Sequence, residues 1–134
     1  MAHTIINPET LHNPVGFGYS HIARGSGEIV FIAGQYASDG DGHVTSEDFA
    51  EQVEQSFANL GSALAAAGLD FRHVVQIRTH IVGHDAAKLE ILARAVQEIW
   101  GDLPPTQTLT GVAALALPGM LFEVDAVALA GDVS

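Results

Sequence analysis

Hydrophobic residues recur along this chain with two different periods. Between residues 49 and 64 apolar side chains return every three or four positions, and between residues 89 and 100 they do so again, so each segment predicts an amphipathic helix. The expected ends are Ser46 or Thr45 and Gly68 for the first helix, and Asp85 and Gly101 for the second.

Shorter runs of β-forming residues predict six strands around the two helices. The strands are expected at residues 3–6, 19–23, 28–36 and 73–82, with two more inside residues 104–129. The second and third strands are predicted to form a hairpin around Gly25 and Gly27, and the last two to be joined by a turn at Pro118-Gly119.

Alternation within the fourth strand separates an apolar from a polar side. The apolar side is expected to carry Val75, Ile77, Thr79 and Ile81, and the polar side Gln76, Arg78 and His80. The order β-β-β-α-β-α-β-β defines one α+β domain over residues 1–134. Because two helices cover only one face of a sheet, the mixed polar and apolar second face favours an interface between subunits.

Composition narrows the range of functions. Of 134 residues 48% are hydrophobic, and the absence of cysteine excludes disulfides and thiol catalysis. The chain has 5 lysines and arginines and 16 aspartates and glutamates, which gives a net charge of −11. Because like charges repel, this balance disfavours nucleic acid and anionic membrane surfaces as partners. No targeting pattern or membrane-spanning run stands out, so a cytoplasmic location is expected.

Two carboxylates stand out in the last strand. Glu123 and Asp125 are two positions apart, so both point to the same face of the sheet. A carboxylate in an apolar strand costs free energy unless water, a ligand or an interface solvates it. The pair either divides acid and base roles or forms ion pairs with Arg78 at a wet interface, and the sequence leaves both readings open.

Neither a metal nor a cofactor is expected. His80 and His84 have the spacing of a helical metal pair, but on a strand they lie roughly 13 Å apart, and no third ligand is close in sequence. Residues 39–42 look like the start of a calcium loop, but the position of its bidentate glutamate falls near Ala50.

Several segments together resemble one known family. They are Gly18-Tyr19-Ser20-His21, Phe31-Ile32-Ala33-Gly34-Gln35, Ala67-Gly68-Leu69 followed by Val74-Val75, and the ending from Leu115 to Ala128. In this order and spacing they resemble the RidA family, also called YjgF or the reactive intermediate deaminases, over nearly the whole chain. The resemblance implies a chorismate-mutase-like (YjgF) fold assembled as a homotrimer, with small-molecule pockets between neighbouring subunits.

The resemblance also implies an activity. Family members hydrolyse enamines and imines, such as 2-aminoacrylate and 2-iminopropionate, without metal or cofactor; an arginine clamps the substrate carboxylate and a glutamate positions the attacking water. Glu123 matches that catalytic glutamate. The matching substrate-binding positions are Tyr19, Gly34, Ala33, Leu109 and Gln107.

Gln107 departs from the family pattern because it stands where the arginine is expected, in Pro105-Thr106-Gln107-Thr108. A neutral amide supplies neither the charge nor the donor fork of a guanidinium, and losing a charged hydrogen bond costs about 1.5–3 kcal/mol. Unless Arg78 or Arg24 supplies another cation, an uncharged ligand is favoured over an amino-acid-derived acid.

Two functions therefore remain open. The first is a cofactor-independent hydrolase of an imine, enamine or related small metabolite, with selectivity altered by Gln107. The alternative is a non-catalytic trimer that binds a small metabolite or acts as a chaperone-like interaction protein. Some family members have been labelled ribonucleases, but the acidic charge balance disfavours that function here.

Overall fold

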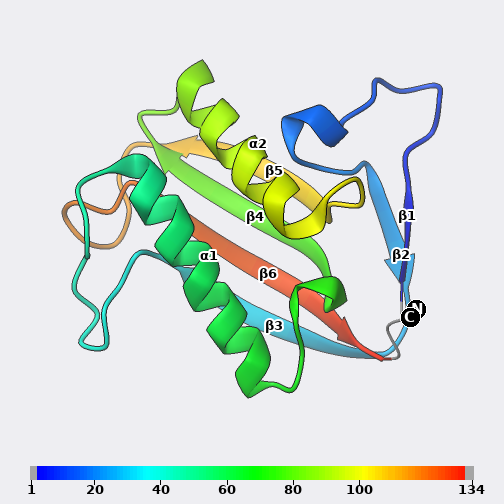
Figure 1. Ribbon diagram of the computed structural model, residues 1–134, viewed down its shortest axis with the longest axis horizontal. Coiled ribbons are helices and arrows are strands. Elements are labelled where there is room, and N and C mark those ends of the chain that lie inside the picture. The colour runs from blue at the N-terminus through cyan, green and yellow to red at the C-terminus, as the bar shows by residue number, and fades with distance from the viewer. Residues whose placement is uncertain (1–2, 132–134) are drawn as a thin grey trace.

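The computed structural model describes residues 3–131. Within this range, two long helices and six strands build a layered α+β structure. The elements are β1 (His3–Ile6), β2 (Ile22–Gly25), β3 (Glu28–Gln35), α1 (Phe49–Ala66), β4 (Val74–Val82), α2 (Ala86–Trp100), β5 (Thr106–Val112) and β6 (Phe122–Ala130). This order was predicted, and Figure 1 shows both helices lying across the same face of the main sheet.

The main sheet has four strands in the order β3-β6-β4-β5. β6 runs antiparallel to both β3 and β4, whereas β5 runs parallel to β4. The predicted turn before β6 is confirmed, because the Met120 N–H donates to the Leu117 carbonyl (3.2 Å) around Pro118 and Gly119, whose φ is 86°. The strands that this segment joins are not neighbours, since β4 lies between them.

The predicted hairpin between the second and third strands is wrong. β2 pairs with β1 in a separate two-stranded sheet, and β3 pairs with β6. Gly27 has a φ of 126°, and a Cβ there would collide with the Ala130 carbonyl oxygen. The glycine therefore carries the chain closely past the end of β6, from one sheet to the other, instead of closing a tight turn.

A bulge shifts the alternation predicted for β4. Its register with β6 changes between Val74 and Gln76, so Val74 replaces Val75 on the side that faces the helices. The buried residues of β4 are Val74, Ile77, Thr79 and Ile81. The polar residues Gln76, Arg78 and His80 lie on the uncovered side, as predicted.

Asp48, rather than Ser46 or Thr45, caps the N-terminus of α1. Its carboxylate accepts a hydrogen bond from the backbone N–H of Glu51 (3.0 Å). The Ser46 hydroxyl is occupied elsewhere, because it donates to the Glu51 carboxylate and accepts from the Asp48 N–H (3.0 Å). The acidic first turn lies where the helix dipole stabilises negative charge.

The other three predicted helix ends are confirmed. Gly68 follows α1 with a φ of 75°, and Asp85 caps α2 by accepting from the Lys88 N–H (2.9 Å). Gly101 ends α2 with a φ of 60°. These ends were predictable because capping depends mainly on residues that are neighbours in sequence.

The hydrophobic core fills the space between the helices and the main sheet. Its most buried members include Leu60 and Leu64 of α1, Leu92 and Val96 of α2, Ile77 and Ile81 of β4, and Phe122 and Val124 of β6. Fully burying one such side chain stabilises the fold by about 1.5–3 kcal/mol. The core thus fixes β4 and β6 side by side, and with them the residues on their other face.

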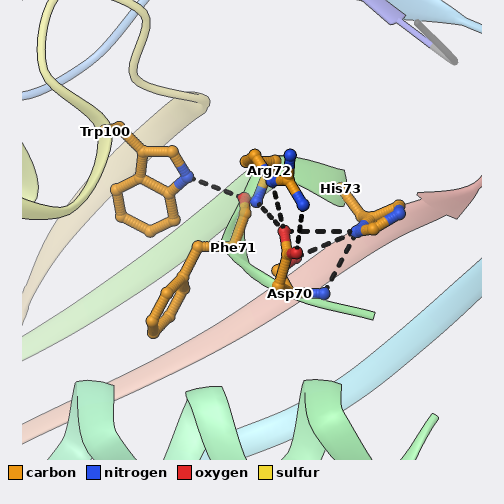
Figure 2. A network of polar contacts seen from close by, with 5 residues as sticks. All are labelled: Asp70, Phe71, Arg72, His73 and Trp100. Carbon is orange, nitrogen blue, oxygen red and sulfur yellow. Dashed lines mark hydrogen bonds and ion pairs between the residues drawn. The ribbon is translucent and has the colours of Figure 1, made fainter. Parts of the chain in front are cut away.

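A polar network fixes the connection from α1 to β4, as Figure 2 shows. Asp70 accepts from the Arg72 guanidinium (2.8 and 3.1 Å) and from the Arg72 backbone N–H (2.9 Å), which lowers the pKa of Asp70 to about 2. Trp100 donates its indole N–H to the Phe71 carbonyl (2.8 Å). The end of α2 is thereby tied to the start of β4.

The face of the main sheet away from the helices mixes apolar and polar side chains, as expected. On β3, Phe31 is 76% exposed and Ile29 is 55% exposed. Neither helix within residues 3–131 is both long and apolar enough to cross a bilayer.

Gln52 provides a test of how the helix layer holds the loops. Its side chain is 0% exposed, donates to the carbonyls of Ser46 and Gly119 (2.8 Å each), and accepts from the Leu121 N–H (2.8 Å). Gln52→Ala should lower the free energy of unfolding by about 2–4 kcal/mol, because it leaves buried backbone groups unpaired. Urea denaturation measures this loss. Gln97→Ala, on the exposed side of α2, should change stability by less than about 0.5 kcal/mol.

Candidate functional site

Glu123 lies on the uncovered face of β6, packed against Gly34 of β3. A Cβ at position 34 would overlap the carboxylate oxygen and lie 2.6 Å from Cδ and 2.9 Å from Cγ of Glu123. The register between β3 and β6 shifts between Ile32 and Gln35, so a bulge opens the space that this carboxylate occupies. The structure thus brings together two of the predicted site residues, and Gly34 is required because it has no side chain.

Ala33 precedes Gly34 in the same bulge and is exposed. Its carbonyl accepts a hydrogen bond from the Gln35 side chain (3.0 Å). The methyl group of Ala33 offers no hydrogen bond to a ligand, so polar recognition beside Glu123 depends on other residues.

Asp125 joins Arg78 and His80 in a charged network next to Glu123. Its carboxylate accepts from Arg78 Nε (2.9 Å) and lies 3.4 Å from His80 Nε2. This pairing raises the pKa of the Arg78 guanidinium through the hydrogen bond to Asp125. The sequence left open whether the two carboxylates form ion pairs with Arg78. Asp125 does, whereas Glu123 stands directly opposite His80 in the strand register.

Gln107 of β5 faces the helix side of the sheet. It pairs in register with the buried Ile77, its Oε1 accepts from the Thr79 hydroxyl (2.8 Å), and its Nε2 donates to the Gly18 carbonyl (2.7 Å). Both polar atoms of the amide therefore have partners inside the protein. Gln107 anchors the loop that carries Tyr19 to the edge of the main sheet.

Four aromatic rings cluster on this anchored loop. His12 is the centre of the cluster: its ring lies 4.9–6.0 Å from the rings of Phe17, Tyr19 and His21, and its Nε2 is 2.6 Å from the Tyr19 hydroxyl. The His12 carbonyl also accepts from His21 (2.9 Å). Sequence reasoning missed His12 and Phe17, because their partners become apparent only when the loop folds back on itself.

The cluster forms one wall of a cavity of about 440 Å³. Three predicted site residues, Tyr19, Gln107 and Leu109, line it, and the remaining lining residues are His12, Phe17, Leu89, Leu92 and Thr108. Tyr19 and Gln107 also line an adjoining cavity of about 440 Å³. Among the described residues, no lysine or arginine lines either cavity.

The predicted site residues therefore form two groups on opposite faces of the sheet. Tyr19, Gln107 and Leu109 lie at the β5 edge on the helix side, and Gly34 and Glu123 lie on the uncovered side nearer β3. Ala33 belongs with the second group. Neither cavity beside Tyr19, as the described residues form it, is lined by Gly34 or Glu123.

The two arginines considered as substitute cations do not lie with Tyr19, Gln107 and Leu109, the cavity group. Arg78 is paired with Asp125 on the uncovered face, and Arg24 lies exposed on β2, opposite Thr4 of β1. The guanidinium that an amino-acid-derived carboxylate needs is therefore absent from the lining of both cavities.

Within residues 3–131 one cluster has the side-chain types of a metal site. Asp39, Asp41 and His43 lie together on an exposed loop. The Asp39 carboxylate accepts from the backbone N–H groups of Asp41 and His43 (2.9 Å each), which lowers the pKa of Asp39. This geometry is that of a turn closed by an aspartate side chain.

Fold and site together define an α+β chain with a carboxylate beside a glycine bulge. Residues 11–130 match the family model described as Endoribonuclease L-PSP. The crystal structure of YyfB, a Rid-family protein of Yersinia pestis, superimposes with a TM-score of 0.92 at 37% identity, covering 97% of this chain and 100% of that one. The chain belongs to the RidA (YjgF) family.

Two curated relatives extend the comparison. The RutC family protein YjgH of Escherichia coli is 34% identical over 82% of this chain and 81% of its own. The human 2-iminobutanoate/2-iminopropanoate deaminase is 30% identical over 78% of this chain and 75% of its own.

Packing of Glu123 against Gly34 can be tested by double-mutant analysis. Gly34→Ala should lower the free energy of unfolding by about 1–3 kcal/mol, because the added methyl group forces the Glu123 side chain out of its place. In a Glu123→Ala background the same change should be nearly neutral. Gly40→Ala, which has open space around the added methyl group, is the control. An equal loss in both backgrounds would contradict the direct contact.

Proposed function

We propose that the chain is a cofactor-independent hydrolase of small, uncharged imines or enamines, with the Glu123 carboxylate as the residue that handles water. The observation that carries this proposal is the half-buried carboxylate against Gly34, on a face that no helix covers. A glutamate placed in this way accepts a proton from a water molecule and aims its oxygen at an electrophilic carbon. The name of the human relative, an iminobutanoate and iminopropanoate deaminase, supports this reaction class.

The lining of the two cavities supports an uncharged substrate. Gln107 was expected to pair with the ligand, but its amide is engaged with Thr79 and Gly18, so its main effect on selectivity is the missing positive charge. Rings of the His12 cluster and the leucines at positions 89, 92 and 109 provide apolar walls. A neutral substrate with a compact apolar body suits such a pocket better than a carboxylate.

Separation of the two residue groups supports pockets completed between copies of the chain. In a homotrimer, the cavity group of one subunit (Tyr19, Gln107 and Leu109) would meet Gly34 and Glu123 of the next. The exposed Phe31 and Ile29 on the uncovered face provide apolar surface for such a contact. With a net charge of −11, the domain repels phosphate backbones, which supports a small molecule and not RNA as the substrate.

A non-catalytic ligand-binding trimer is the second candidate. It is favoured by the internal hydrogen bonds of Gln107, which give that residue a structural role at the position of the family's arginine. Turnover distinguishes the two candidates directly.

A matched substrate pair tests the proposed reaction and its selectivity. Freshly generated 2-iminopropionate and its neutral amide, 2-iminopropanamide, differ mainly in charge. Wild type should favour the amide over the acid by about 10–100-fold in kcat/KM. Gln107→Arg should shift this preference toward the acid by a similar factor, because a charged hydrogen bond is worth about 1.5–3 kcal/mol. Glu123→Gln should lower kcat on both by about 100-fold or more.

Gln107→Met is the control for the substitution at position 107, because it removes the hydrogen bonds to Thr79 and Gly18 without adding charge. It should not improve turnover of the acid. Preference of the wild type for 2-iminopropionate would contradict the proposed selectivity, and absence of turnover on both imines would favour the binding protein.

Subunit complementation tests the shared pocket. Tyr19→Ala disables the group of residues around the cavity, and Glu123→Gln disables the group on the uncovered face. In oligomers that mix the two variants at random, about a quarter of the interfaces should join an intact cavity group from one subunit to an intact Glu123 from the next, and so form a wild-type pocket. Sedimentation should show trimers. Mixed trimers without regained activity, or a monomer at micromolar concentration, would overturn the shared pocket.

A further inference from the structure

His80 occupies a position that the proposed mechanism has not used. It lies on β4 directly opposite Glu123 of β6, and both side chains point to the uncovered face. Opposite residues in an antiparallel pair have Cβ atoms about 4.5–5.5 Å apart. The His80 side chain is 27% exposed, so it remains accessible to a small molecule beside Glu123.

Asp125 decides which nitrogen of His80 is free. The carboxylate lies 3.4 Å from His80 Nε2 and 2.9 Å from Arg78 Nε. An ionised carboxylate only accepts hydrogen bonds, so the neutral ring carries its proton on Nε2 and presents Nδ1 as the basic atom. Arg78 holds Asp125 in place from the other side, which fixes the orientation of the imidazole.

Among the described residues of β4, β5 and β6 that neighbour His80, Arg78 is the one positively charged side chain. The charged groups on its own face are Glu123 and Asp125 from β6 and Arg78 from its own strand. On β5 the opposite residue is Thr110, which is uncharged. Two acidic groups and one paired arginine therefore surround a histidine whose Nδ1 has no hydrogen-bond partner within residues 3–131.

We propose that His80 is a second catalytic residue of the Glu123 site, which transfers protons to and from the substrate through Nδ1, while Glu123 takes a proton from the attacking water and passes it to the leaving nitrogen. This assignment rests on the proposed hydrolase function. It gives the two groups different tasks, as acid–base pairs in other enzymes require.

Each step balances for an imine. Water adds its oxygen to the imine carbon while Glu123 takes one water proton, and the nitrogen, which receives the C=N π electrons, takes a proton from the His80 imidazolium. The product of this step is a carbinolamine. Glu123 then gives its proton to the nitrogen, the C–N bond breaks with its electron pair leaving on ammonia, and the hydroxyl proton passes to His80 Nδ1 as the carbonyl forms. Imine and water become carbonyl and ammonia, and both side chains return to their starting states.

Kinetics of His80→Gln provide the main test. The variant should lose about 100-fold or more in kcat on 2-iminopropanamide with little change in KM, because a positioned acid contributes about 10²–10⁴-fold. His84→Gln, in the exposed turn after β4, should keep the wild-type kcat and KM.

Nuclear magnetic resonance of the histidine nitrogens gives a readout that does not depend on turnover. The neutral His80 ring should be the Nε2–H tautomer in the wild type, and Asp125→Asn should shift it toward the Nδ1–H form. An Nδ1–H tautomer in the wild type would overturn the assignment. Wild-type kinetics in His80→Gln would overturn His80 alone, whereas a wild type that hydrolyses no imine would remove the hydrolase and the role of His80 together.

Discussion

The structure depends on the position of β6 between β3 and β4. Its helix-facing side supplies Phe122 and Val124 to the core, and its other side places Glu123 between Gly34 of β3 and His80 of β4. Because side chains alternate along a strand, a slip of one residue would bury the carboxylate and expose the core. The same hydrophobic packing that stabilises the fold therefore sets the register of the polar residues on the uncovered face.

Gln107 links a second region to this framework by hydrogen bonds. The amide connects Thr79, inside the sheet, to the Gly18 carbonyl, and so holds the loop with the His12 cluster against β5. A guanidinium has only donors and could not accept from the Thr79 hydroxyl as the glutamine oxygen does. The glutamine at position 107 thus bridges two parts of the same chain.

The sequence predicted what depends on local chemistry and missed what depends on distant contacts. Element order and most helix ends follow from periodicity and capping, whereas the partner of β2 depends on a close approach of Gly27 to Ala130, far away along the chain. Motifs indicated the candidate site residues as a set, and their role stays a prediction. Their division between two faces could not be predicted from the sequence, because it depends on which strands pair and where a bulge falls.

This division explains how one position can change without disabling another. Gln107 acts on the helix side at the β5 edge, while Glu123 is held on the uncovered side by Gly34. No hydrogen bond within residues 3–131 joins the two side chains, so a substitution at position 107 is expected to leave the carboxylate and its bulge in place. Under the proposed function, selectivity and water handling are separate properties of one fold, and a second copy of the chain would bring the two faces together.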